Sequence, residues 1–467
     1  MTDTSDRRTK IWVLTLASLA SFMIFLDAMV VTTALSTISR DLGAAIEALE
    51  WAVNAYNLSF AVLLLTGAVL GDRFGRRRMF LAGLTLFVAA SAACALAHNA
   101  AWLIGARAVQ GAGAALVMPL AMTLLGAAFP REERAKALGI FSSVSGLALI
   151  AGPAAGGAIA GGLDWQWIFL INIPIGLVII PFGIVRIPES FGAVARIDLG
   201  GLVLVTAAAL AVVAGLMRVN SAGWASPEMV AMLVAGIILA VTFVVWELRA
   251  RAPMVPMRFF QSRAFASGVA ASFPFYAAMY AVAFFLPQFL QVGQGYGPLG
   301  AGLRMLPWSA TLFVVAPIGG ALVNRIGERA PVVVGVLLQA IGFAWIALTA
   351  APDLAYGQLV APLIIAGTGV SMAMPAAQNA VLSSVAGAEV GKASGTFNML
   401  RYLGGVFGIA IAVTAFSGTG SLASAATFSS GFAAAIGVSA ALSFLAAIAA
   451  MWLPGRAVVL APAVAKA

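Results

Sequence analysis

Long apolar runs alternate with short polar joins along the whole chain, and this pattern predicts a protein made almost entirely of membrane-spanning helices. A bilayer core cannot hydrogen-bond to free backbone groups, so each spanning run must form a helix of about 20 apolar residues. Fourteen such runs are present, and few residues remain for a soluble domain. The runs begin near Ile11, Trp51, Met79, Ala101, Leu138, Gln166, Asp198, Glu228, Phe265, Ala301, Pro331, Tyr356, Thr396 and Ser430.

The distribution of positive charge sets the expected orientation of these helices. Alternate joins carry most of the 26 Lys and Arg residues, and cytoplasmic joins are the ones enriched in such residues. We therefore expect both chain termini to lie on the cytoplasmic side. The chain is then a multi-pass protein of the cell membrane, with the lipid bilayer as its immediate partner.

The chain also contains an internal repeat, a feature of transporter folds in which two halves rock about a central site. Glycines, a Met-Pro pair and a Lys-Ala-x-Gly segment recur in the same order and at one constant offset. The first set is Gly111, Gly113, Met118, Pro119, Lys136, Ala137, Gly139 and Gly152, and the second is Gly367, Gly369, Met374, Pro375, Lys392, Ala393, Gly395 and Gly408. Asp72, Arg73 and Gly75 are similarly matched by Asn324, Arg325 and Gly327.

The helix count and the repeat together predict an all-α polytopic membrane protein. It has two six-helix halves and two extra central helices, which makes 14 transmembrane helices. We expect an N-terminal half over residues 1–190 and two inserted helices over 191–250. A cytoplasmic linker is expected over 251–264, and the C-terminal half with a short tail over 265–467.

Composition argues against several other classes of protein. The net charge of +9 is dispersed over the joins rather than gathered on a soluble face, so we expect no nucleic acid partner. One cysteine, Cys94, and one histidine, His98, leave no intrachain disulfide and too few ligands for a zinc site. The sequence lacks a phosphate-binding loop and the residue set of a catalytic centre. We therefore expect neither an enzyme nor a bound metal or cofactor.

Several short motifs follow one another in a fixed order. They are LDAMVVTTAL (Leu26–Leu35), GDRFGRRR (Gly71–Arg78), RAVQGAGAA (Arg107–Ala115), GPAAGG (Gly152–Gly157), WQWIFLINIPIG (Trp165–Gly176) and FLPQFLQVGQGYGPLGAGL (Phe285–Leu303). Together they resemble the signatures of the major facilitator superfamily and of its fourteen-helix drug:proton antiporter branch, which includes multidrug and quaternary-ammonium exporters. The resemblance implies the major facilitator fold and the export of small compounds in exchange for protons.

The charged join between the second and third helices is a candidate conformational latch. Its residues are Asp72, Arg73, Gly75 and Arg76. A carboxylate beside clustered arginines can bridge to neighbouring helix ends in one transporter state and release them in the other. The alternative is that the arginines set membrane topology and contact anionic lipid.

Asp27 is the expected proton carrier, with Arg107 as its partner. An ionised group inside a membrane helix costs several kcal/mol, so Asp27 needs a partner or a proton. If the first helix ends near Ser36, the two residues lie roughly 13 Å and 9 Å deep at about 1.5 Å rise per residue. Contact is then possible, and an acid that pairs with Arg when ionised and carries a proton when released supplies a switch. The alternative is a static ion pair that fixes helix packing.

Other acids are expected outside the membrane core. Asp41, Glu47 and Glu50 are assigned to the first outer join. Glu247 is assigned to a surface pair with Arg249 or Arg251. On this interpretation the chain has no second deep carboxylate.

The GPAAGG segment supplies Gly152, Pro153, Gly156 and Gly157 to the fifth helix. Small residues at this spacing let another helix approach closely, and Pro153 can bend the helix. The resemblance implies that this bend governs the direction of exchange. Ordinary small-residue packing is the alternative.

A substrate site is expected between the halves near the membrane midplane. Aromatic walls with few fixed charges suit bulky amphipathic or cationic molecules. The candidates are Thr33, Asn54, Tyr56, Asn57, Gln110, Tyr276, Gln378 and Asn379, with Thr32, Phe273, Tyr280 and Asn398 as further possibilities. Taken singly, each side chain also fits ordinary helix packing.

These observations favour a proton-coupled antiporter that exports small amphipathic or cationic drugs and antibiotics. The alternative keeps the fold and changes the cargo to one self-made metabolite or lipid. The expected partners are a small-molecule substrate and protons, and the sequence leaves the oligomeric state open.

Overall fold

The computed structural model describes residues 2–192, 197–223 and 226–455. Within these ranges, 14 helices are long and apolar enough to cross a membrane. Their positions agree with the apolar runs, so the predicted all-α polytopic fold is confirmed. The agreement has a simple cause, since each span must satisfy its backbone hydrogen bonds internally.

The N-terminal part of the chain forms six of these spans. Its helices are α1 (Thr2–Leu42), α2 (Ile46–Phe74), α3 (Arg76–Ala95), α4 (Ala100–Ala128), α5 (Arg131–Gly162), α6 (Trp167–Leu170) and α7 (Asn172–Arg186). The short α6 and the longer α7 make one span with a break at Ile171. The long α5 continues through Pro153 without interruption.

The last part of the chain forms another six spans. Its elements are α10 (Arg263–Gln288), η2 (Phe289–Gly293), α11 (Pro298–Arg304), α12 (Leu306–Ser309), α13 (Thr311–Ile326), α14 (Arg329–Thr349), α15 (Tyr356–Leu382), η3 (Gly387–Glu389), α16 (Val390–Thr419) and α17 (Ala425–Ala450). The π-helix η2 continues α10, and α11 to α13 make one interrupted span.

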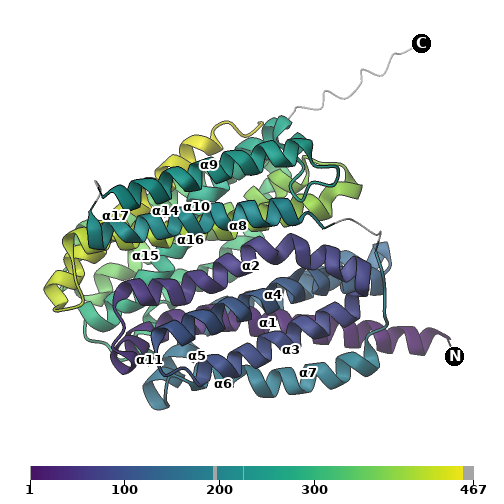
Figure 1. Cartoon of the computed structure of the whole chain (residues 1–467), viewed down its shortest axis with the longest axis horizontal. Helices are drawn as coiled ribbons and strands as arrows, with labels where there is room; N and C mark the ends of the chain where they lie inside the picture. Colours follow the sequence, from purple (N-terminus) through teal and green to yellow (C-terminus); the bar gives the residue numbers. More distant parts are fainter. Residues whose placement is uncertain (1, 193–196, 224–225, 456–467) are drawn as a thin grey trace, which may run out of the picture.

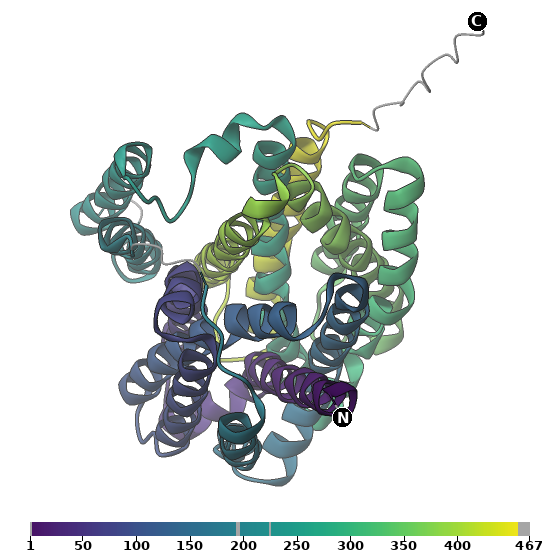
Figure 2. The ribbon, with the colours of Figure 1, turned by 90° about the vertical axis from the view of Figure 1, so that its right-hand side faces the viewer.

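Two further spans, α8 (Leu199–Ala222) and α9 (Pro227–Arg249), lie between these two groups in sequence. The short 3-10 helix η1 (Met257–Gln261) follows them. Viewed along the helix axes, α8 and α9 lie at the periphery of the bundle (Figure 2). Helix α8 contacts α2 and α16, whereas α9 packs mainly on α8.

The start of α1 and the end of α17 lie at the same end of the bundle (Figure 1). We call this the N-terminal end and the other the opposite end. The expected end of the first helix near Ser36 was wrong, because α1 continues to Leu42. Its last turns keep their polar groups bonded: Ser36 Oγ donates to Gln291 Oε1, and Asp41 Oδ2 accepts from Trp165 Nε1 at 2.6 Å. The depth calculated for Asp27 from that helix end was therefore also wrong.

Gly113 and Gly369, which match in the repeat, make the same kind of contact in the two groups of helices. Gly83 on α3 and Gly113 on α4 lie against each other's backbone. Gly335 on α14 and Gly369 on α15 make the same contact in the second group. Because a side chain at any of these positions would overlap the facing helix, both helix pairs approach closely for the same reason.

Both ends of the bundle have contacts between the two groups of helices. At the opposite end, Gln291 of η2 donates from Nε2 to Thr33 O on α1 at 2.8 Å. Helix α5 packs on α11 at that end, and α2 packs along α16. Gly395 of α16 lies against Leu65 of α2 nearer the N-terminal end. The space enclosed by these contacts contains the candidate site.

Candidate functional site

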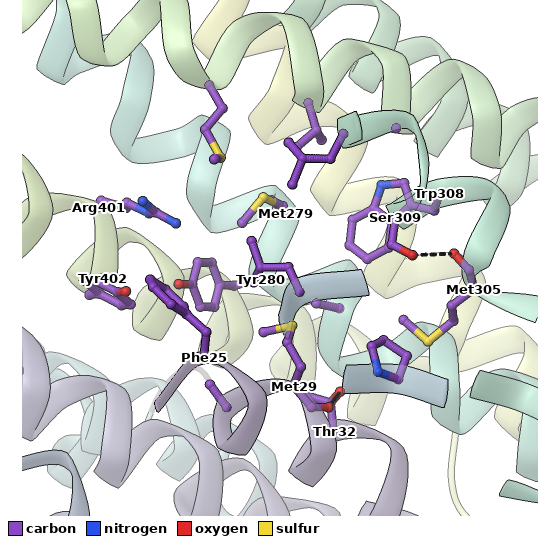
Figure 3. A pocket seen from close by; sticks show the side chains of 18 of the residues that line it. Phe25, Met29, Thr32, Met279, Tyr280, Met305, Trp308, Ser309, Arg401 and Tyr402 are labelled. Carbon is purple, nitrogen blue, oxygen red and sulfur yellow. Dashed lines mark hydrogen bonds between the residues drawn. The ribbon is translucent and has the colours of Figure 1, made fainter. Parts of the chain in front are cut away.

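A central cavity lies between the two groups of helices, with walls from α1, α2, α5, α10, α12, α15 and α16 among others. Most of its surface is apolar. The aromatic side chains in its wall are Phe25, Tyr56, Phe60, Tyr280, Trp308 and Tyr402. The polar and charged ones are Thr32, Ser309, Ser371 and Arg401. Figure 3 shows the labelled side chains pointing into the space from several helices. Such a wall suits a bulky apolar compound held by few polar groups.

Asp27 on α1 and Arg107 on α4 form an ion pair inside the first group of helices. Arg107 Nη1 lies 2.5 Å from Asp27 Oδ2, and the two side chains are 2% and 0% exposed respectively. Arg107 Nε also donates to Ala52 O on α2 at 3.2 Å. The contact that the sequence allowed is therefore present, and it is shielded from water.

Three polar side chains surround this pair. Gln110 Nε2 and Asn172 Nδ2 each donate to Asp27 Oδ1 at 2.8 Å. The hydroxyl oxygen of Ser91 accepts from Gln110 at 2.7 Å and from Asn172 at 3.2 Å. We call Asp27, Ser91, Arg107, Gln110 and Asn172 the Asp27 cluster. These bonds offset the cost of burying the two charges.

Sequence reasoning missed Ser91 and Asn172. Asn172 begins α7, directly after the break at Ile171, and it is an amide in an otherwise apolar run. A polar side chain at that depth was a usable signal, because membrane helices retain such groups where they have a partner or a function. Ser91 gave no comparable signal, since serines are common at helix contacts.

Tyr56 on α2 connects the Asp27 cluster to the cavity. The Arg107 guanidinium carbon lies 4.2 Å from the centroid of the Tyr56 ring, a cation–π geometry. The Tyr56 ring also lines the cavity, next to Phe60. A compound in the cavity can therefore touch a ring whose other contact is the buried arginine.

The other predicted pocket residues of α1, α2 and α4 lie outside the cavity wall. Thr33 is buried against α5 and donates from Oγ1 to Val30 O at 2.9 Å. Gln110 belongs to the Asp27 cluster, and Asn54 Nδ2 donates to Glu50 Oε1 at 3.1 Å. Asn57 is buried but absent from the wall. Depth along a helix does not specify which neighbour a side chain faces.

The predicted pocket residues of the C-terminal half also lie elsewhere. Tyr276 is fully buried beside Arg401, whose guanidinium carbon is 4.5 Å from its ring centroid. Gln378 is absent from the wall. Asn379 is exposed near the N-terminal end and donates from Nδ2 to Glu328 Oε1 at 2.8 Å. Of the further candidates, Thr32 and Tyr280 line the cavity.

The candidate latch is a set of local contacts at the N-terminal end. Asp72 Oδ1 pairs with Arg76 Nε at 2.8 Å, one helical turn further along the chain. Arg73 is exposed and has no ion pair among the described residues. Gly75 has φ of 106°, a left-handed conformation that favours glycine. In this structure the pair links α2 to α3.

Glu189, after α7, is an additional acid at this join that sequence reasoning missed. Its carboxylate accepts from the backbone N–H of Arg77 at 2.9 Å and of Arg78 at 3.3 Å. These are free amide groups in the first turn of α3, where a negative charge is stabilising. The two guanidinium groups lie 3.7 Å from the same carboxylate. A Cβ at Gly75 would overlap Glu189, so the glycine makes room for this contact.

The glycines of the GPAAGG segment place α5 against two helices. Gly152 and Gly156 lie against α1. Gly157 lies against the Pro298 carbonyl of α11, while Gly302 of α11 lies against the Pro153 carbonyl. A Cβ at any of these four glycines would overlap the neighbouring helix. The segment is therefore a close contact between the two groups of helices at the opposite end.

Two acids are more deeply buried than the sequence suggested. Glu50 is in α2 and fully buried, and its Oε2 has no hydrogen-bond partner within the described residues. Glu247 is 2% exposed and accepts from Val255 N at 3.1 Å. The expected placement of Glu50 in an exposed join and of Glu247 in a surface ion pair was wrong. Helix α2 begins at Ile46, so its first turns are packed rather than solvated.

The chain belongs to the major facilitator superfamily, whose sequence profile matches residues 17–409. The resemblance of the sequence motifs is thereby confirmed at the level of the family. Proteins of this family are transporters rather than enzymes. Together with its 14 spans, the match defines this chain as a multi-pass membrane transporter.

Similar proteins are named for export and resistance. Multidrug resistance protein Stp of Mycobacterium tuberculosis (strain CDC 1551 / Oshkosh) is 33% identical over 406 residues, covering 86% of this chain and 75% of Stp. Cephamycin export protein CmcT of Amycolatopsis lactamdurans is 35% identical over 436 residues, covering 91% of this chain and 89% of CmcT. The crystal structure of a POT family transporter in complex with a thioalcohol-conjugated peptide superposes with a TM-score of 0.71. The alignment covers 95% of this chain and 95% of the other at 15% sequence identity, which establishes the shared fold.

Proposed function

We propose that this transporter exports small amphipathic drugs or antibiotics across the cell membrane in exchange for protons. The main support is the buried ion pair of Asp27 and Arg107, whose side chains are 0% and 2% exposed respectively. The pair contacts the cavity wall through Tyr56. The N-terminal end of the bundle is cytoplasmic in this proposal, in agreement with the positive charge of its joins. The names of the relatives support export of such compounds.

The coupling step is proton binding to Asp27. A proton on the carboxyl group removes its charge, so the attraction to Arg107 is lost and the buried guanidinium needs other partners. Tyr56 and the Ala52 carbonyl are already in contact with that guanidinium. Movement of Arg107 therefore moves the Tyr56 ring in the cavity wall. Proton binding and substrate binding are coupled through this ring.

The halves move as units about the cavity in this proposal. The units are residues 1–190 and 265–467, with 191–250 as a peripheral insert and 251–264 as a cytoplasmic linker. The contact of Gly157 and Pro153 with α11 must open for the cavity to reach the outer side. Asp72, Arg73, Gly75 and Arg76 act as the latch at the cytoplasmic end, where Asp72 changes partners between states.

The test uses everted membrane vesicles with an acidic lumen and a pH-sensitive dye. Cationic, neutral and acidic drugs are added one at a time to vesicles with the wild type, Asp27→Asn or Asp41→Asn. Asp41 is a matched control, since it is on the same helix and bonds Trp165 outside the Asp27 cluster. We expect drug-evoked proton release with the wild type and Asp41→Asn and none with Asp27→Asn at equal protein levels. Equal release with Asp27→Asn would reject Asp27 as the carrier.

The same panel decides the range of cargo. One relative is named for multidrug resistance and another for export of one antibiotic. Responses to several unrelated compounds indicate a broad exporter. A response to a single compound or lipid indicates the narrow alternative on the same fold.

A further inference from the structure

We propose that Arg401 binds an acidic group of the exported compound, so that the substrates of the central cavity are amphipathic organic acids. This proposal rests on the proposed export function and names its substrate class. Arg401 is on α16, and its side chain lines the cavity. It is the one charged side chain in the cavity wall among the described residues.

Arg401 is only partly buried, and it lacks the carboxylate partner that Arg107 has. No carboxylate of the described residues lies within ion-pair distance of it, and its Nε is buried without a hydrogen-bond partner. Arg107 has the opposite environment, with an aspartate, a glutamine and a backbone carbonyl around it. The guanidinium of Arg401 therefore keeps an unused N–H donor at Nε, although the Tyr280 side chain is a hydrogen-bonding neighbour.

Aromatic rings keep this charge in place without neutralising it. The guanidinium carbon of Arg401 lies 4.5 Å from the Tyr276 ring centroid and 5.4 Å from that of Tyr402. Cation–π contacts of this kind compensate part of the cost of desolvation. They leave Nε of Arg401 without a hydrogen-bond partner, and a planar guanidinium matches a carboxylate through two parallel hydrogen bonds.

The arrangement of the wall specifies the rest of the ligand. Arg401 lies on one side of the cavity and Trp308 on the other, with Met279 and Tyr280 between them (Figure 3). A compound with an acidic group at one end and an aromatic or apolar body at the other fits this order. The body then packs on methionine and aromatic side chains, which adapt to varied shapes.

The same geometry disfavours the simple cations that the sequence suggested. The lining has no carboxylate among the described residues. Asp27 is enclosed in its own cluster and already accepts bonds from three side chains. A cation in the cavity gains contact with aromatic rings but is repelled by Arg401.

The test measures equilibrium binding of three matched probes to the purified full chain in nanodiscs, with empty nanodiscs subtracted. The probes are 1-pyrenebutyrate, 1-pyrenebutanol and the corresponding pyrenebutyl trimethylammonium, which share one aromatic body. We expect the acid to bind the wild type at least about tenfold more tightly than the alcohol, the factor for one charge-assisted hydrogen bond. The cation should bind most weakly.

Variants assign the preference to one side chain. Arg401→Gln should bind the acid and the alcohol within about twofold of each other while keeping the affinity for the alcohol, which also reports that it is folded. Arg401→Lys should keep part of the preference, because it keeps the charge. Arg304→Gln is the matched control, since Arg304 also lies on an aromatic ring, 3.6 Å from the Tyr296 centroid, and is absent from the cavity wall.

Equal affinity of the wild type for acid and alcohol would overturn the proposal. So would a preference that survives Arg401→Gln, or the absence of saturable binding by any probe. Binding at equilibrium needs no proton gradient, and Asp27→Asn should keep the preference for the acid. If the wild type prefers the acid but shows no drug-evoked proton release, the antiport mechanism alone is rejected. If it shows proton release but no preference for the acid, this proposal alone is rejected.

Discussion

Removing both charges of the Asp27–Arg107 pair should lower the free energy of unfolding by much less than the sum of the losses caused by the two single substitutions. Three donors point at the Asp27 carboxylate, from Arg107, Gln110 and Asn172. Asp27→Asn leaves one acceptor oxygen and introduces an N–H group that faces at least one of these donors. It also leaves the Arg107 charge, 2% exposed, without a carboxylate.

The magnitude follows from these contacts. Breaking a buried pair by removing one partner costs about 3–5 kcal/mol, because an uncompensated charge remains. We expect about that cost for Asp27→Asn and for Arg107→Gln. The double variant has two amides and no buried charge, so it should cost at least about 2 kcal/mol less than the sum of the single variants.

The assay is reversible unfolding of the purified protein in mixed micelles, followed by tryptophan fluorescence for the wild type, both single variants and the double variant. The control cycle uses Asp72→Asn and Arg76→Gln. That pair has a 2.8 Å contact, and its Asp72 and Arg76 side chains are 30% and 20% exposed. A coupling energy of about 0–1 kcal/mol is expected there. Additive costs at Asp27 and Arg107, within about 0.5 kcal/mol, would refute the account of a tightly coupled buried pair.

Three further predictions test other contacts. Gly157→Leu should widen the distance between α5 and α11, measured with spin labels, because the new side chain would overlap α11. Gly162→Leu should leave that distance unchanged, because the space around Gly162 is open. An unchanged distance in Gly157→Leu would count against the contact. Glu189→Gln should lower the free energy of unfolding by about 1–3 kcal/mol, because a charged acceptor at the start of α3 is lost. Glu50→Gln should raise the Tm at neutral pH, because an amide can donate to the unpaired Asn54 Oδ1, and a lower Tm would contradict this reading.

The number and positions of the helices could be predicted because a bilayer imposes one physical condition on every span. The ends could not be placed as well. The sequence around Ser36 and Asp41 indicated a polar join, yet both residues are in α1. Ser36 is hydrogen-bonded to Gln291, and Asp41 to Trp165. Polar residues near a helix end continue the helix when another segment supplies their partners. Whether such partners are present depends on the tertiary fold, and local hydropathy does not reveal it.

The Asp27–Arg107 contact could be predicted for a related reason, since a deep charge requires an opposite charge and few were available. The remaining members of the Asp27 cluster depend on how four helices are oriented about their axes. Glu50 was missed because its position near a helix start resembles a solvated one. Arg401 was not among the predicted site residues, because nothing in the local sequence indicates that it faces a cavity.

In the proposed mechanism, proton movement through Asp27 drives export. The most direct measurement uses proteoliposomes in which one compound active in the vesicle assay is followed in two modes, accumulation driven by an imposed proton gradient and exchange of labelled for unlabelled compound without a gradient. We expect Asp27→Asn to keep exchange and lose accumulation, whereas the wild type performs both. Gradient-driven accumulation by Asp27→Asn at the wild-type level would contradict this mechanism.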